Sequence, residues 1–211
     1  MNLYKPTDEN IWTGRESSKD LYVYQKVKQI DLEIQNIPVT ANNSFILLGY
    51  ECDEGVRRNG GRPGSGKGPQ AARSQLAKLP HHLDENTAIF DAGNVVCLGD
   101  DMEKAQSVLA EKVTQVLNNK GMPLLLGGGH DMAYGHYKGI KKFLGKDKSI
   151  GIINVDAHFD LRKNTSGNNS GTPFYQVAED CKDDGATFNY LCLGIRKDAN
   201  DKVLFQTAHD F

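Results

Sequence analysis

Three side chains that can bind a metal ion lie close together in the second half of the chain. Asp156, His158 and Asp160 are each separated by one residue, and they follow the apolar run that opens residues 149–160. In an extended backbone alternate side chains point the same way, so these three would converge on one point. Two carboxylates and an imidazole suit a divalent cation such as Mn²⁺. A polar loop whose side chains only cap the next element is the alternative, and this segment alone does not decide between them.

A second segment favours the metal centre. His130 follows another short apolar run and three glycines, in Met-Pro-Leu-Leu-Leu-Gly-Gly-Gly-His-Asp at residues 122–131. Glycines adopt backbone conformations closed to other residues and let other groups approach closely. If both apolar runs are parallel strands, their carboxyl ends meet at one edge of the sheet, where open α/β sheets bind ligands. His130 would then lie beside Asp156 and Asp160.

The segments that must position these residues alternate between strand and helix patterns. This alternation predicts a mainly parallel sheet covered by helices on both faces. We expect strands at residues 45–50, 95–99, 124–126, 149–155 and 189–195, of which 149–155 has the apolar pattern of a strand buried on both faces. We expect helices at residues 69–79, 101–120, 131–144 and 173–180, an arm packed over the sheet at 1–40, and a loop at 163–171.

Composition is that of an ordinary globular protein. The chain has 211 residues, a formal net charge of −2 and no basic run, so we expect a single domain over residues 1–211 and no nucleic-acid partner. No apolar run is long enough to cross a bilayer, and the N-terminus has no apolar signal core, so we expect no membrane association. The four cysteines are far apart and form no Cys-x-x-Cys pair, which favours reduced thiols in a cytoplasmic protein.

The glycine-rich loop before residue 69 also resembles a phosphate-binding loop. Gly61 and Gly66-Lys67 have the required spacing, but Gly68 stands where that motif needs Ser or Thr. The preceding strand also does not run directly into the loop. We therefore do not expect a nucleotide site.

Several motifs resemble the ureohydrolase (arginase/agmatinase) family. They are Gly-Gly-Gly-His-Asp at 127–131, Asp-Ala-His-Phe-Asp at 156–160, and the loop from Asp-Glu-Gly-Val-Arg-Arg-Asn at 53–59 to Gly-Pro at 68–69. The continuation Leu-Arg at 161–162 and Ser-Gly-Thr-Pro-Phe at 170–174 look most like the formimidoylglutamase branch of that family. The resemblance covers about residues 45–196, and it implies a three-layer α/β/α, arginase-like fold.

The resemblance also implies a centre with two Mn²⁺ ions bridged by a hydroxide. His130, Asp156 and Asp160 would bind one ion, and Asp156 and His158 would bind the other. The hydroxide would attack the electrophilic carbon of a guanidine or formimino group. Asp160 would hydrogen-bond the hydroxide and pass its proton to the leaving amine.

Arg162 bears on the choice of substrate. It lies two residues beyond Asp160, so an extended path would bring it to the same side, where a guanidinium can bind a carboxylate through two hydrogen bonds. The resemblance places an arginine here in the formimidoylglutamase branch and a smaller amide in arginases. We therefore expect hydrolysis of the small molecule N-formimino-L-glutamate to L-glutamate and formamide, as in histidine degradation. The alternative for Arg162 is a surface ion pair.

Asn59 and Arg62, in the glycine-rich loop, are predicted as further substrate contacts. Their alternative is a purely turn-forming role.

One departure from the family pattern changes these expectations. The family supplies further metal ligands from a later Ser-x-Asp-x-Asp-x-x-Asp-Pro segment, whereas this sequence contains no Asp-x-Asp. We therefore expect a domain truncated at its C-terminus, with weak or single-site Mn²⁺ binding and little activity. We also expect an exposed apolar sheet edge that leads to self-association as a homo-oligomer. Another ureohydrolase activity (agmatinase-like or on a guanidino acid) and a non-catalytic protein that keeps the fold for binding or assembly stay open as alternatives.

Overall fold

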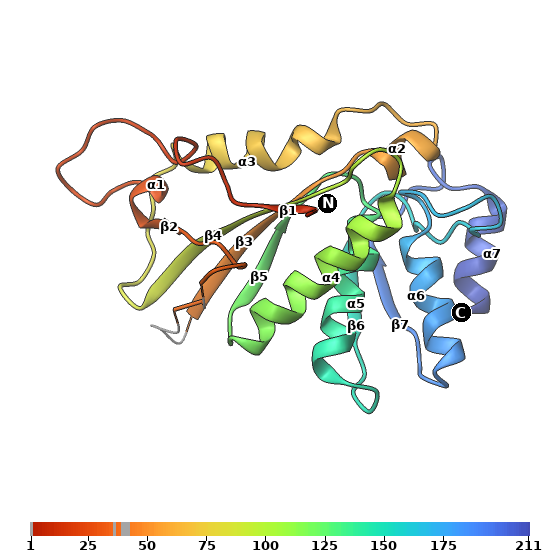
Figure 1. Cartoon of the computed structure of the whole chain (residues 1–211). Helices are drawn as coiled ribbons and strands as arrows, with labels where there is room; N and C mark the ends of the chain where they lie inside the picture. Colours follow the sequence, from red (N-terminus) through yellow and green to blue (C-terminus); the bar gives the residue numbers. More distant parts are fainter. Residues whose placement is uncertain (1, 36, 39–42) are drawn as a thin grey trace.

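The computed structural model describes residues 2–35, 37–38 and 43–211. Its strands are β1 (Tyr4–Lys5), β2 (Val27–Gln29), β3 (Asn43–Glu51), β4 (Thr87–Val96), β5 (Met122–Leu126), β6 (Gly151–Val155) and β7 (Asn189–Leu193). Its helices are α1 (Val23–Lys26), α2 (Glu54–Arg58), α3 (Gly68–Leu76), α4 (Met102–Asn118), α5 (Met132–Leu144), α6 (Pro173–Asp183) and α7 (Lys202–Asp210), with a short 3₁₀ turn at Ser65–Lys67. Strands and helices alternate from β3 onward, as predicted (Figure 1).

The strands form two sheets. In the larger sheet the order is β1-β4-β3-β5, and β2 also pairs with β4. β3 lies between β4 and β5 and is parallel to both, while β1 is antiparallel to β4. β6 and β7 form a separate parallel pair, in which Ile153 lies opposite Leu191. The prediction of a mainly parallel α/β fold is confirmed.

Helices cover both faces of the larger sheet. Alternate residues of β3 explain this arrangement, because side chains along a strand point to opposite faces. Ile46 and Leu48 belong to the same buried cluster as Leu109 and Val113 of α4. Leu47 points the other way and packs with Ala77, just after α3. α3 and α4 accordingly lie on opposite sides of the sheet, which gives the predicted three layers (Figure 1).

Residues 1–40, predicted to be an arm over the sheet, add strands as well as packing. β1 and β2 both pair with β4, and Trp12 packs in the cluster that contains Leu47. The indole Nε1 of Trp12 also donates to Oδ2 of the buried Asp91 at 2.7 Å. Residues 1, 36, 39 and 40 of this arm lie outside the described residues.

Three element predictions are corrected. Residues 54–58, expected to be part of the glycine-rich loop, form α2. The strand expected at residues 95–99 is β4, which begins at Thr87 and ends at Val96, because the segment before residue 95 pairs with β2 and β3 along its length. α7 was not predicted at all. The side chain of Asp201 accepts hydrogen bonds from the backbone N–H groups of Val203 and Leu204 and so caps its first turn.

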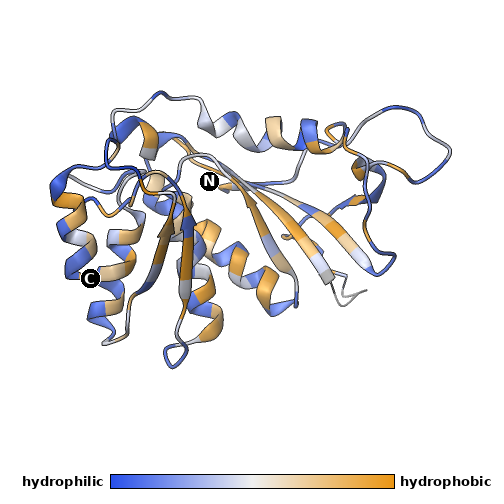
Figure 2. Cartoon of the chain, turned by 180° about the vertical axis from the view of Figure 1, so that it is seen from behind, coloured by the Kyte–Doolittle hydropathy of each residue, from blue (hydrophilic) through white to orange (hydrophobic). Residues whose placement is uncertain are grey.

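The prediction that residues 149–155 form a strand buried on both faces is wrong. The side chains of Ile153 and Val155 are 69% and 80% exposed, whereas Ile152 packs against the cluster that contains Tyr137 and Val177 of α5 and α6. β6 pairs only with β7, and no element of the described chain covers the face opposite α5 and α6. Figure 2 views the molecule from behind, the side on which this sheet is uncovered.

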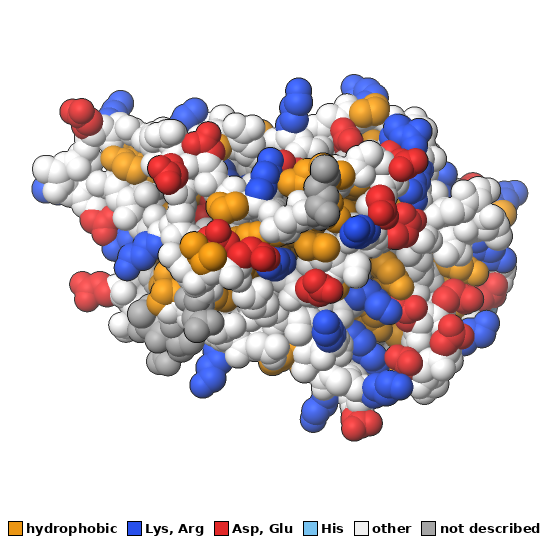
Figure 3. All heavy atoms as spheres, in the orientation of Figure 1, with side chains coloured by type: hydrophobic (Ala, Val, Ile, Leu, Met, Phe, Trp, Pro, Cys, Tyr) orange, Lys and Arg blue, Asp and Glu red, His pale blue; other side chains and the backbone are white. Residues whose placement is uncertain are grey.

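Charged side chains of both signs are mixed over the face shown in Figure 3, with apolar side chains between them. This mixture agrees with the formal net charge of −2. Among the described helices, none combines the length and the apolar character that a bilayer span requires.

Candidate metal centre

The site lies just beyond the ends of β5 and β6. After β5 the backbone passes close to β3, where the N–H of Gly128 donates to the carbonyl oxygen of Tyr50 at 2.9 Å. A Cβ atom at Gly128 would lie 2.3 Å from the carbonyl oxygen of Cys52, so only glycine fits there. This close approach directs the chain into His130 at the start of α5, beside the segment that follows β6.

His130, Asp156 and Asp160 come together as the sequence predicts. The Nδ1 atom of His130 lies 2.5 Å from Oδ2 of Asp160 and 3.5 Å from Oδ2 of Asp156. One potential ligand atom from each residue falls within 4.8 Å of the others, and no second group of this kind was found in the part of the chain that the structure describes. Two carboxylates and an imidazole at this spacing fit a divalent cation such as Mn²⁺.

The path by which these side chains converge differs from the predicted one. β6 ends at Val155, and residues 156–158 bend instead of continuing as a strand. Asp160 has a φ of +48°, in the left-handed region that Asp enters more readily than most residues. A turn after the strand, not an extended backbone, therefore brings Asp160 back toward His130.

Asp156 faces both histidines. Its Oδ2 atom is the one nearest His130, while its Oδ1 atom accepts from the backbone N–H of His158 at 2.9 Å and lies 3.2 Å from the Nδ1 atom of His158. His158 is half-exposed and lines the same cavity, but it is not a member of the three-residue cluster. The two oxygens of Asp156 thus face different histidines, as is expected of a carboxylate that bridges two metal ions.

The electrostatics around His130 come from the carboxylates on its open side and from burial. The hydrogen bond to Asp160 raises the pKa of His130, and burial opposes that shift. Behind it Asp131 is fully buried, and burial raises the pKa of this carboxyl to about 6 although the hydroxyl of Tyr50 donates to its Oδ2 atom at 2.9 Å. The Oδ1 atom of Asp131 has no hydrogen-bond partner in the described chain.

Asp131 and Tyr50 were not predicted as site residues. Asp131 is part of the motif around His130, so the sequence pointed to it. The burial of Asp131, however, depends on the packing of α5 against β3, which the sequence does not give.

A cavity of about 300 Å³ opens over the cluster. Besides the four predicted metal ligands it is lined by Asn59 and Arg162, both predicted as substrate contacts, and by Ser170, which was not predicted. Asn59 donates to the hydroxyl oxygen of Ser170 at 3.1 Å. Arg62 is exposed and does not line this cavity, so the structure does not bring it to the other predicted residues.

Arg162 is held on the loop of residues 163–171, which we call the polar loop. Its backbone N–H donates to the carbonyl oxygen of Gly171 at 3.0 Å. A Cβ atom at Gly171 would lie 3.0 Å from Cδ of Arg162 and 3.3 Å from Nδ2 of Asn59, so the arginine side chain crosses the loop backbone beside Asn59. Arg162 therefore lines the same cavity as the cluster of His130, Asp156 and Asp160.

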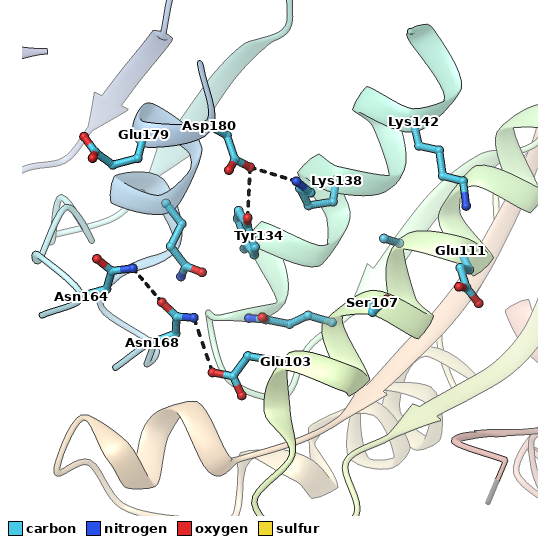
Figure 4. Close-up of a pocket in the computed structure, with 13 residues that line it drawn as sticks. Glu103, Ser107, Glu111, Tyr134, Lys138, Lys142, Asn164, Asn168, Glu179 and Asp180 are labelled. Carbon is cyan, nitrogen blue, oxygen red and sulfur yellow. Dashed lines mark hydrogen bonds and ion pairs between the residues drawn. The ribbon is translucent and has the colours of Figure 1, made fainter. Parts of the chain in front are cut away.

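A larger cavity, of about 570 Å³, lies among α4, α5, α6 and the polar loop (Figure 4). It shares no lining residue with the cavity over the cluster. On its wall Tyr134 and Lys138 both donate to Asp180, at 3.0 and 3.2 Å. Because the cluster of His130, Asp156 and Asp160 lies in the smaller cavity, we assign the candidate site there.

Comparison with known proteins adds the evolutionary relationship. The model of the arginase family matches residues 43–211. The formimidoylglutamase of Geobacillus sp. (strain WCH70) is 41% identical over 99% of this chain, and that of Chromobacterium violaceum is 44% identical over 95% of it. The chain spans 64% and 63% of the length of these curated relatives.

Solved structures agree with the fold. A Trypanosoma cruzi formiminoglutamase with Mn²⁺ is 28% identical, with a TM-score of 0.69 over 82% of this chain and 60% of that chain. The formimidoylglutamase of Bacillus subtilis is 20% identical, with a TM-score of 0.75 over 93% of this chain and 59% of that chain. The second likeness shows the fold alone.

Proposed function

Because the chain belongs to the arginase family, we propose that it acts in the manganese-dependent hydrolysis of N-formimino-L-glutamate to L-glutamate and formamide. The observation that carries this proposal is the single cavity shared by the cluster of His130, Asp156 and Asp160 and by the guanidinium-bearing Arg162. The relatives named formimidoylglutamase and the related Mn²⁺ complex support the same assignment.

The proposed metal ligands divide between two ions. His130, Asp156 and Asp160 would hold one Mn²⁺, and Asp156 and His158 the other. When bound, the metal supplies charge neutralisation and activation of water near neutral pH. The positions of the two Asp156 oxygens, one toward each histidine, support the bridging role of this residue.

Asp160 is proposed to move the proton. Its carboxylate lies within hydrogen-bond distance of His130 and lines the cavity, so it borders both the metal ligands and the space for substrate. From there it would hold the proton of the attacking water and deliver it to the leaving nitrogen. The bond between the amidine carbon and the nitrogen of the glutamate part would then break, which releases L-glutamate and formamide.

Arg162 and Asn59 are proposed to select the substrate. A guanidinium binds a carboxylate through two charge-assisted hydrogen bonds and repels a cationic group. N-formimino-L-glutamate has two carboxylates, whereas agmatine has none and carries an additional positive charge. The position of Arg162 in the cavity therefore favours the glutamate derivative over agmatine.

The experiment is a substrate comparison with the purified, Mn²⁺-loaded chain. We expect slow release of formamide from N-formimino-L-glutamate, in keeping with the weak or single-site Mn²⁺ binding expected from the sequence, and no release of urea from agmatine or arginine. Faster hydrolysis of agmatine or of arginine, or formamide release that does not depend on Mn²⁺, would contradict the proposal. Binding of L-glutamate, measured by calorimetry, provides a readout of the site that does not depend on turnover.

We further propose that residues 1–211 act as one domain that self-associates in the cytoplasm. The free Cys52, Cys97, Cys181 and Cys192 support a reducing compartment. The exposed apolar residues of β6 and β7 support self-association.

A further inference from the structure

Arg58, the last residue of α2, joins three segments of the chain. Its Nε atom donates to Glu54 at 2.9 Å, within the same helix. Its Nη1 and Nη2 atoms donate to the carboxylate of Glu103 at 2.6 and 3.2 Å, at the start of α4. Nη2 also donates to the carbonyl oxygen of Asp100 at 2.5 Å, and Nη1 to that of Asn168 in the polar loop at 3.2 Å. The planar guanidinium uses all three of its nitrogens.

The polar loop has local hydrogen bonds of its own, from the backbone N–H of Asn169 to the Thr172 hydroxyl at 3.0 Å and from that of Gly171 to Oδ1 of Asn169 at 2.9 Å, and further contacts join it to α2 and α4. It is rich in Asn, Gly and Ser, which leave the backbone many conformations to lose on ordering. Within it Asn164 donates to Asn168, and Asn168 donates to Glu103, the same carboxylate that Arg58 binds (Figure 4). Arg58 and Glu103 thus hold the middle of the loop through both a backbone and a side-chain contact.

The end of the polar loop reaches the candidate site. The backbone N–H of Ser170 donates to the carbonyl oxygen of Gly55 in α2 at 3.0 Å, and Asn59 donates to the Ser170 hydroxyl. Arg162 donates from its backbone to Gly171. The carbonyl that Arg58 binds lies close to Ser170 along the chain, so a shift of the loop there would move Ser170 and Gly171.

We propose that Arg58 is a positioning residue for the candidate site, which holds the polar loop against α2 and so keeps Arg162, Asn59 and Ser170 at the mouth of the cavity. The inference rests on the proposed function, because the group positioned is the predicted carboxylate-binding arginine. Arg58 lines no part of the cavity over the cluster and touches none of the metal ligands. It should therefore affect the affinity for a dicarboxylate and leave that for Mn²⁺ unchanged.

Arg57 provides a matched control. It has the same type of side chain, in the same helix, and also pairs with Glu54, at 2.6 Å. Its side chain is 61% exposed, whereas that of Arg58 is 26% exposed. Within the described residues, the side-chain hydrogen bonds of Arg57 go to Glu54 and none joins it to α4 or the polar loop. A general loss of charge or of α2 stability would affect both variants.

The test compares Arg58→Met with Arg57→Met in the whole Mn²⁺-loaded chain. We expect Arg58→Met to accelerate amide hydrogen exchange in residues 168–171 and to raise the Kd for L-glutamate about tenfold, equivalent to ~1.4 kcal/mol. The Kd for Mn²⁺ should stay the same in both variants, and Arg57→Met should resemble the wild type in all three measurements. Arg58→Lys keeps the charge without the planar guanidinium, so its exchange rates and its Kd for L-glutamate should lie between those of the wild type and of Arg58→Met.

Equal exchange rates and equal L-glutamate affinities in the Arg57 and Arg58 variants would overturn the proposal. If Arg58→Met does not fold, Glu103→Gln, which weakens the same contact, takes its place with the same expectations. Failure of the wild-type chain to bind L-glutamate would count against the proposed function. The exchange measurement would still decide whether Arg58 holds the loop, so the two failures are distinguishable.

Discussion

The Nδ1 atom of His130 lies 2.5 Å from the Oδ2 atom of Asp160, although 30 residues separate them in the chain. Each residue follows a strand end, one after β5 and one after β6, and these strands do not pair with each other. The contact is therefore made by the turns beyond the strands. It is the relationship on which the assignment of a metal centre depends.

Removal of a metal ligand should weaken Mn²⁺ binding strongly. We expect His130→Ala and Asp160→Asn each to raise the Kd for Mn²⁺ by at least about tenfold, the lower end of the effect seen when only an outer-shell partner is lost. His82→Ala, at an exposed position, serves as the control and should bind like the wild type. Calorimetric titration measures the Kd for Mn²⁺ of all three variants. Values equal to that of the wild type for His130→Ala and Asp160→Asn would show that these residues are not metal ligands.

Removal of Arg162 should affect dicarboxylate binding alone. Arg162→Met should raise the Kd for L-glutamate by roughly 10- to 100-fold, because hydrogen bonds to a charged group contribute about 1.5–3 kcal/mol. Its affinity for Mn²⁺ should not change. Arg62→Met, outside the cavity, tests the other predicted substrate contact. An effect as large as that of Arg162→Met would show that Arg62 reaches the substrate from its exposed position.

The ion pairs of Glu54 should make stability depend on pH below neutrality. Hydrogen bonds from Arg57 and then Arg58 lower the pKa of the buried Glu54 to about 2, from 4.5 in the unfolded chain. Because the folded pKa is depressed, this stabilisation is complete above about pH 4.5 and is lost as the pH falls toward 2.

Glu54→Gln tests this dependence. The variant should be less stable than the wild type at about pH 7, and the difference should shrink at about pH 3. Urea unfolding at the two pH values measures the difference in the free energy of unfolding between the variant and the wild type. A difference of the same size at both pH values would contradict the lowered pKa of Glu54.

The uncovered face of β6 and β7 should drive self-association. Ile153 and Leu191 lie opposite each other in the parallel register and are 69% and 51% exposed. We expect Ile153→Thr with Leu191→Thr to weaken association, because Thr keeps the preference for strands and removes apolar surface. Val203→Thr, at an exposed position of α7, is the control. Sedimentation at several concentrations decides, and unchanged association of the double variant would place the interface elsewhere.

Sequence patterns predicted the features that depend on local periodicity. The helix expected at residues 101–120 and the strand expected at residues 45–50 are α4 and β3, and both contribute buried residues to one cluster, including Leu109 and Ile46. His130, Asp156 and Asp160 were predicted to meet because the runs before them were expected to be parallel strands that end at one edge of a sheet. The three residues do meet, but β5 and β6 belong to separate sheets, so the expected topology was wrong and the turns after the strands make the contact.

Features that depend on tertiary packing could not be predicted in this way. The apolar run at Ile153 and Val155 looks the same whether one face or both are covered, so its exposure was missed. The left-handed backbone of Asp160 depends on the turn that places it against His130. The contacts of Arg58 with α4 and the polar loop join residues that are 42 to 110 positions apart, and no sequence spacing indicates them.

Anomalous diffraction at the manganese absorption edge, from crystals soaked in Mn²⁺, tests the central claim most directly. We predict an anomalous peak within coordination distance of His130, Asp156 and Asp160, and its loss in the His130→Ala variant. An anomalous map without a peak at these three side chains, in crystals that hold manganese elsewhere, would contradict the assignment of the metal centre.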